Sequence, residues 1–283
     1  MELLLIRGAA VLIAAAISAY TDYKTGLIPD KITYSLIALG AVLLIFDFNF
    51  QAVLISGAVF AIGYVFYYAG KFGGGDVKLF TGIALVLPVL GGQVFVITVL
   101  FAASAFAAVW MGAYYAIKYF RGGGGFNENR KRIILACALG IVVSALLALS
   151  AWGGRISLFA AMAMGVPLLF ALLFVALERG IRRTCFLERV NIGALDEDDI
   201  IAIEFMGEGQ AEKLGTMFRA GLKGIIDEKA KRGLEKLGIK EVPVYRNLPR
   251  FGPFILAGVI IALLMPDLLF LIVPVGGTAY ALG

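Results

Sequence analysis

Residues 73–78 read Gly73-Gly74-Gly75-Asp76-Val77-Lys78 and lie between two apolar runs. A similar polar stretch, Thr21-Asp22-Tyr23-Lys24-Thr25-Gly26-Leu27-Ile28-Pro29-Asp30, ends the first apolar run of the chain. Burying a carboxylate in a membrane costs roughly 2.5–3.5 kcal/mol on insertion scales, so an acidic residue at such a place indicates a function. We therefore predict that Asp22 and Asp76 form one aspartyl site at a membrane face.

The composition is that of a membrane protein. Of the 283 residues, 61% are hydrophobic and only 16% are charged, whereas soluble domains carry about 25% charged residues. A bilayer-spanning helix needs about 20 apolar residues. We predict an all-α polytopic membrane protein with eight transmembrane helices, or nine if the last apolar segment crosses, and a small α+β cytosolic insertion. The lipid bilayer is thus an expected partner, and nucleic acid is not.

Nine apolar segments support this fold class. The first is predicted to be a retained span rather than a cleaved signal peptide, because its start carries only Arg7 and polar residues follow it. Segments 79–90, 251–265 and 268–282 are shorter than a crossing usually requires. The distribution of positive charge, described below, favours a short span for 79–90. The segments are 3–20, 32–46, 52–69, 79–90, 94–117, 133–152, 156–177, 251–265 and 268–282.

Positive charge predicts the orientation. If the first span runs from outside to inside and each segment through 251–265 crosses, all 25 lysines and arginines except Arg7 and Arg155 lie on the inner side. Cytoplasmic loops carry such an excess. The same orientation places Asp22 and Asp76 together on the cytoplasmic side, and it places Asp47 and Asp267 on the other.

The polar region 178–250 divides the chain. We predict a transmembrane domain over 1–177 with both aspartates, a cytosolic domain over 178–250 and one or two transmembrane segments over 251–283. Within the cytosolic domain we expect strands at 200–205 and 239–245 and a helix over 210–237. The acidic run Asp196-Glu197-Asp198-Asp199 fits a solvated face, or a dock for a basic segment of a partner.

Residue types narrow the chemistry. Histidine is absent, which excludes Ser-His and Cys-His triads. Two cysteines provide neither a disulfide framework nor a CxxC zinc pair. We expect no metal and no cofactor. Two neighbouring carboxylates share a proton, so one can act as a general base on water while the other donates to a scissile carbonyl.

The glycines and Lys78 belong to the same predicted site. Gly73 and Gly75 would let a substrate backbone lie close to Asp76, and they permit dihedral angles that other residues avoid. The start of the helix after Asp76 favours an ionised carboxylate, which suggests Asp22 as the protonated partner. Lys78 would extend to lipid headgroups or pair with Asp76.

Simpler readings remain open for each acid. Asp22 could mark the interface where the first span ends, and Asp76 could cap the helix that follows it. Asp30 follows Pro29 and fits an N-cap of the second span, although it is the next candidate if one of the pair is not catalytic.

These motifs resemble those of the type IV prepilin peptidases and archaeal preflagellin peptidases, which are Gly-x-Gly-Asp membrane aspartyl proteases. The resemblance lies in the stretch Asp22–Asp30, in Gly73–Leu79, and in the closing Pro249-Arg250-Phe251-Gly252-Pro253-Phe254. It implies a catalytic pair, Asp22 and Asp76, that cleaves the short basic leader from a pilin-like or archaellin precursor before the precursor's hydrophobic helix. The cysteine-rich zinc loop that the bacterial enzymes often carry after the first span has no counterpart in the short connection 21–31, which contains no cysteine.

Two other classes of protein remain as alternatives. A presenilin-like protease would use the same pair to cut inside a transmembrane helix of its substrate. A transporter would use the two acids to couple cations or protons, although no internal repeat of the kind found in transporters is apparent.

Overall fold

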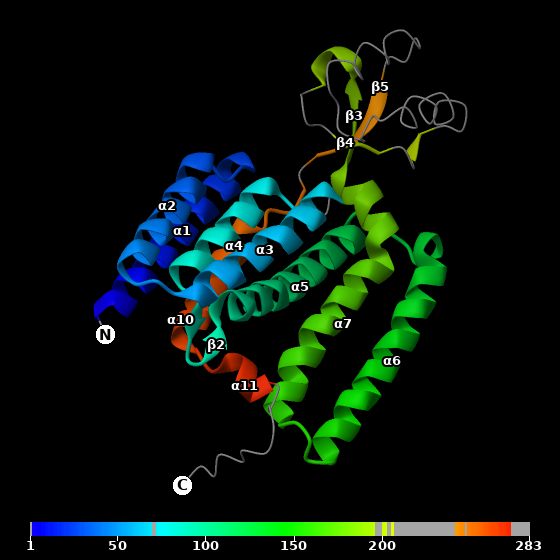
Figure 1. Cartoon of the computed structure of the whole chain (residues 1–283). Coiled ribbons are helices and arrows are strands. Elements are labelled where there is room, and N and C mark those ends of the chain that lie inside the picture. The colour runs from blue at the N-terminus through cyan, green and yellow to red at the C-terminus, as the bar shows by residue number, and fades with distance from the viewer. Residues whose placement is uncertain are drawn as a thin grey trace. The chain divides into compact units, whose positions relative to one another are not determined.

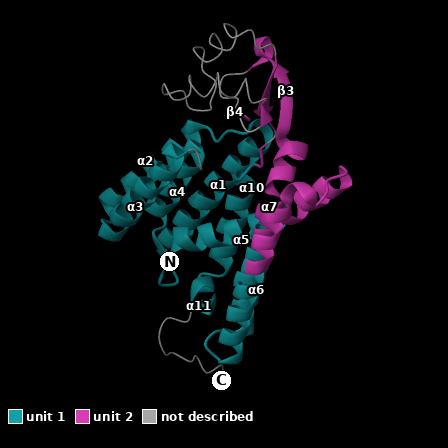
Figure 2. Ribbon diagram, turned by 90° about the vertical axis from the view of Figure 1, so that its right-hand side faces the viewer, with its two compact units in different colours: residues 1–110, 139–171, 250–283 teal, residues 111–138, 172–249 magenta. Residues whose placement is uncertain are grey.

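A computed structural model describes residues 2–69, 72–195, 200–202, 205–206, 241–246 and 248–272. The chain forms two compact units, which Figure 2 shows in different colours. The first comprises residues 1–110, 139–171 and 250–283, and the second comprises residues 111–138 and 172–249.

Helices dominate the described part of the chain, in agreement with the predicted fold class (Figure 1). The helices are α1 Glu2–Thr25, α2 Asp30–Phe46, α3 Phe50–Tyr68, α4 Gly74–Val86, α5 Phe95–Arg121, α6 Arg130–Trp152, α7 Leu158–Ile181, α10 Gly252–Leu264 and α11 Leu268–Ile272. The strands are β1 Val89–Leu90, β2 Gln93–Val94, β3 Leu187–Asn191, β4 Ile200–Ile201 and β5 Glu241–Tyr245.

Five described helices, α1, α3, α5, α6 and α7, are long and apolar enough to cross a membrane. They coincide with the five segments whose length alone predicts a crossing. The helix α2 begins at Asp30 and has 17 residues, and α4 and α10 have 13 each. A 13-residue helix is about 20 Å long, and the hydrocarbon core is about 30 Å thick. The number of spans therefore stays a prediction.

The first unit buries an apolar core between α1, α2, α4, α10 and the start of α5. Contacts join α1 to α10, α2 to α4, and α3 to α4. The buried face of α1 is rich in small residues, which let neighbouring helices approach closely. Gly258 of α10 allows a similar approach, because a Cβ there would lie 2.5 Å from the carbonyl oxygen of Val99. The buried core consists of Val11, Ala14, Ala15, Leu36, Leu79, Phe80, Ile83, Ala84, Val86, Leu87, Phe95, Val96, Val99, Ile255, Val259 and Ala262.

The segment predicted as one span over 79–90 is helical only in its first part, because α4 begins earlier, at Gly74, and ends within the segment. The helix α4 ends at Val86, and β1 pairs antiparallel with β2 around the turn at Gly91 and Gly92. Both glycines have positive φ angles, 60° and 73°, which other residues rarely adopt. This hairpin was not predicted, since its strands are only two residues long.

The second unit contains a three-stranded antiparallel sheet in the order β3–β5–β4. A strand was predicted over 239–245, and β5 confirms it. The predicted strand over 200–205 is reduced to β4, and β3 was missed. The predicted helix over 210–237 and the acidic run 196–199 lie outside the described residues.

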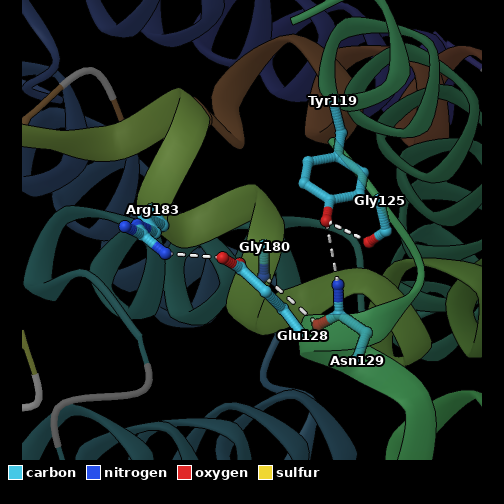
Figure 3. A network of polar contacts seen from close by, with 6 residues as sticks. All are labelled: Tyr119, Gly125, Glu128, Asn129, Gly180 and Arg183. Carbon is cyan, nitrogen blue, oxygen red and sulfur yellow. Dashed lines mark hydrogen bonds and ion pairs between the residues drawn. The ribbon is translucent and has the colours of Figure 1, made fainter. Parts of the chain in front are cut away.

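A buried polar network fixes the glycine-rich turn over residues 122–125 in the second unit (Figure 3). The hydroxyl of Tyr119 donates to the carbonyl of Gly125 at 2.6 Å and accepts from Nδ2 of Asn129 at 3.3 Å. The amide oxygen of Asn129 accepts from the N–H of Gly180 at 3.2 Å. Nearby, Arg183 forms an ion pair with Glu128. The network satisfies an asparagine that is only 1% exposed, so we assign it a structural role.

Candidate active site

Asp22 lies on the last turn of α1, at the point where the helix ends. The helix stops at Gly26, whose φ angle of 77° suits the left-handed conformation of a helix C-terminus. The N–H of Gly26 donates to the carbonyl of Asp22 at 2.8 Å. The Asp22 residue is buried, with an exposed fraction of 8%. The apolar pattern of residues 3–20 and the glycine after it thus place an acid at the end of a buried helix face.

Two residues near the start of α10 contact Asp22. The N–H of Gly252 donates to Oδ2 of Asp22 at 2.7 Å, and Nη1 of Arg250 donates to its backbone carbonyl at 2.8 Å. The first N–H groups of a helix have no acceptor within that helix, so the Asp22 carboxylate supplies one for α10. Sequence reasoning did not predict these contacts. An arginine and a glycine directly before an apolar run were the only signal.

Asp76 lies in the first turn of α4, which begins after the N-cap Gly73. This confirms its predicted position at a helix start. Asp76 precedes the apolar segment 79–90. Burial raises the pKa of its carboxyl from 3.8 to about 7, the Asp22 carboxylate adds to the rise, and a backbone hydrogen bond from Gly73 opposes it. That last contact also fits the simpler prediction, in which Asp76 caps its own helix.

The two candidate acids are brought together within the first unit. Asp22 acts electrostatically on Asp76, although the two residues stand on different helices. The segments that precede α4 and α10 also meet, because the rings of Phe72 and Phe251 lie 6.0 Å apart at an interplanar angle of 70°. The ring of Phe72 contacts Phe80 of α4 as well. An aromatic cluster thus joins the start of the helix with Asp76 to the start of the helix that contacts Asp22.

The glycines of residues 73–75 are needed for space inside the protein. A Cβ at Gly73 would lie 2.8 Å from Oδ2 of Asp76, and a Cβ at Gly75 would lie 2.9 Å from Cβ of Ile28. Gly73 has φ −73° and ψ 141°, which any residue can adopt. Gly73 therefore does not use the wider range of dihedral angles that glycine permits. The predicted approach of a substrate backbone stays a prediction.

Lys78 has a different partner from the one expected. Its Nζ donates to Oδ1 of Asp30 at 2.6 Å and lies 4.8 Å from the centre of the Tyr34 ring. The N-cap of α2 is Pro29, and no side chain caps that helix end. The predicted cap by Asp30 and the predicted pairing of Lys78 with Asp76 are therefore both wrong. An ion pair instead joins the start of α2 to the first turn of α4. It raises the pKa of Lys78 through its hydrogen bond to Asp30.

The other acids predicted to lie away from the pair have their own surroundings. Asp47, at the end of α2, forms an ion pair with Arg7 at 2.9 Å. Asp267 lies beside the β1–β2 turn, where a Cβ at Gly91 would come within 2.8 Å of its carboxylate. In the described part of the chain no three His, Cys, Asp or Glu side chains are grouped so that they could hold a metal.

Comparison with known proteins adds evidence of a different kind. A model of the type IV leader peptidase family matches residues 9–117, which include Asp22, Asp30, Gly73–Gly75, Asp76 and Lys78. Prepilin peptidase EppA of Methanothermobacter thermautotrophicus is 36% identical over 86 residues. That alignment covers 27% of this chain and 22% of the relative. No solved structure matches the chain.

The family match covers α1 to α4 and most of α5, so it contains both candidate acids together with the helices that carry them. The contacts from Arg250 and Gly252 lie outside it. The match over residues 9–117 therefore agrees with the resemblance of these motifs to the type IV leader peptidases.

Proposed function

We propose that the protein is a membrane aspartyl endopeptidase that cleaves the short basic leader from prepilin-like or preflagellin precursors at the cytoplasmic face of the cell membrane. The observation that carries the proposal is the electrostatic effect of Asp22, at the end of one helix, on Asp76, at the start of another, within the part that matches the leader peptidase family. The name of the curated relative supports a prepilin-like substrate.

In the proposed mechanism Asp76 holds the proton of the pair, and Asp22 acts as the general base. The raised pKa of Asp76 supports this assignment, which reverses the one expected from the helix dipole alone. Asp22 takes a proton from water while the water oxygen bonds to the scissile carbonyl carbon. Asp76 gives its proton to the carbonyl oxygen. The tetrahedral intermediate then breaks its C–N bond, and the leaving amine takes the proton from Asp22. One hydroxyl of the intermediate returns its proton to Asp76 as the new carboxyl group forms, which restores the pair.

The substrate would meet the site with its hydrophobic helix in the bilayer and its leader at the polar face. Asp22 and Asp76 both lie at helix ends that adjoin polar segments, which favours a cut at the edge of an apolar helix rather than inside it. Asp196–Asp199 stay a predicted dock for the leader. Neutralising the four acids should weaken substrate binding without lowering turnover at saturation.

The test uses purified full-length protein in lipid nanodiscs with a prepilin-like precursor, and the mass of the product locates the cut. We expect wild type to cut at the leader boundary, and both Asp22→Asn and Asp76→Asn to lose the cut. Cleavage that survives in one variant would move the role to Asp30. A cut inside the apolar helix would favour a presenilin-like protease. A well-folded wild type that cleaves none of several such precursors would favour cation or proton transport.

A further inference from the structure

We propose that Arg250 and Gly252 are positioning residues that hold Asp22 in its reactive orientation. Gly252 acts on the carboxylate, and Arg250 acts on the main chain of the same residue. This inference rests on the proposed function, because it assigns a task in that reaction to two residues outside the matched range 9–117.

The contact between residue 252 and the Asp22 carboxylate requires a residue without a side chain. The N–H of Gly252 donates to Oδ2 of Asp22 at 2.7 Å across 230 positions of sequence. A Cβ at residue 252 would lie 2.8 Å from Cβ and 2.9 Å from Oδ2 of Asp22. Any side chain at this position would push the carboxylate away from its donor. A glycine therefore allows α10 to begin directly against the acid.

The main-chain contact fixes the end of α1. Nη1 of Arg250 donates at 2.8 Å to the carbonyl of Asp22, which also accepts from the N–H of Gly26. The guanidinium lies against Gly26 so closely that a Cβ there would be 2.4 Å from Nη1. A carbonyl oxygen has two lone pairs, so the arginine adds a second donor to the one that Gly26 supplies. The same chain segment thus holds Asp22 by its backbone and by its side chain.

The arginine does not neutralise the acid. Among the described residues, Arg250 forms no ion pair with the Asp22 carboxylate, although its guanidinium reaches the carbonyl of the same residue. A direct pair would tie up the oxygen that is proposed to take a proton from water. The carboxylate instead receives one N–H on Oδ2. This arrangement orients a base without giving it a counter-ion.

The activity test measures turnover and KM separately for Arg250→Ala, Arg250→Lys and Gly252→Ala. A displacement of about 1 Å costs up to about 100-fold in rate, so we expect turnover to fall at least tenfold in the two alanine variants with KM nearly unchanged. Arg250→Lys should recover part of the loss, because an ammonium group can also donate to a carbonyl. Turnover close to that of wild type in both alanine variants would overturn the proposal, as would a loss confined to KM.

Matched controls separate positioning from general damage. Gly57→Ala adds a methyl group on α3, where nothing lies within 4 Å of the added atom. Arg155→Ala removes an exposed arginine after α6. Both variants should retain the turnover of wild type. If Gly57→Ala loses as much turnover as Gly252→Ala, the loss does not arise from Asp22 and the inference falls.

A second measurement does not depend on activity. We would compare the drop in thermal midpoint caused by Gly26→Ala in wild type and in Arg250→Ala. The drop should be smaller without the guanidinium, because contacting residues couple. Equal drops in thermal midpoint in the two backgrounds would show that Arg250 does not act on Gly26, and would overturn the inference. If wild type cleaves no precursor, the proposed function fails, and this comparison still decides whether Arg250 bears on the end of α1.

Discussion

The two ends of α1 each bury one charged residue, and they treat it in opposite ways. Arg7 is 9% exposed and is paired with Asp47 at 2.9 Å. Asp22 is 8% exposed and receives an N–H from Gly252, and its carboxylate acts on a second acid, Asp76 of α4. Among the described residues no cation pairs with the Asp22 carboxylate.

The difference shows what each charge is for. A buried charge with a counter-ion serves the fold, since removing either partner leaves the other unsatisfied. A buried acid placed beside another acid raises the free energy of the folded state, and such an arrangement is usual at reactive sites. The first end of α1 should therefore govern stability, and the second should govern turnover.

The largest effect is expected on turnover, at the C-terminal end of α1, where Asp22 lies. Asp22→Asn and Asp76→Asn should each lower turnover by about 1,000-fold or more, the upper part of the range for acid–base catalysis. The thermal midpoint should stay unchanged or rise, because an acid without a counter-ion is removed. Peptidase assays and thermal unfolding of the same preparations check both. A marked fall in the thermal midpoint of either variant would show that the substituted acid stabilises the fold instead.

The second largest difference between the two ends of α1 is expected in the pH dependence of stability and turnover. The pKa of Asp76 is raised from 3.8 to about 7, so the unfolded chain loses this proton before the folded one does. Stability should therefore fall as pH rises from about 4 to 7 and then level off. Turnover should also fall as pH rises through about 7, because the proton donor is lost. In Asp76→Asn the stability decline should flatten, and in Asp47→Asn it should persist. The same decline in both variants would contradict the assignment.

The N-terminal end of α1, where Arg7 lies, should give a smaller effect, on stability rather than on turnover. Asp47→Asn leaves the buried guanidinium of Arg7 without its counter-ion, and an unsatisfied group of this sort costs about 1–3 kcal/mol. We expect a lower free energy of unfolding and an unchanged turnover at a temperature where the variant is folded. Denaturant unfolding and initial rates measure the two quantities. A variant that unfolds normally but loses turnover would remove the contrast between the ends.

The smallest effect is expected at the pair that joins α2 to α4. The Asp30 side chain is 61% exposed and the Lys78 side chain 28%, and exposed pairs contribute about 0.2–1 kcal/mol. Asp30→Asn should therefore lower stability slightly and turnover only a few-fold, by loosening the first turn of α4. The exchange Asp30→Lys with Lys78→Asp should restore part of both. A loss of turnover as large as that of Asp76→Asn would make Asp30 a member of the catalytic pair.

Local patterns predicted most of the helices, because an apolar run between polar stretches is enough to locate one. They also placed Asp22 at a helix end and Asp76 at a helix start. They failed where a partner is distant in sequence. Lys78 pairs with Asp30 across 48 positions, and Arg250 reaches Asp22 across 228. The strand β3 was missed for the same reason, because its partner β5 follows about 50 residues later.

The contact between Arg250 and Asp22 also has a consequence for biosynthesis. Chains are made at about 5–20 residues per second, so the 228 positions between the two residues correspond to roughly 10–45 s of translation. For most of this interval both α1 and α4 have been made, but Arg250 and Gly252 have not. On the proposed assignment the nascent protease has both acids and lacks the segment that orients one of them. Its turnover would therefore stay at least tenfold below the final value until α10 has been inserted.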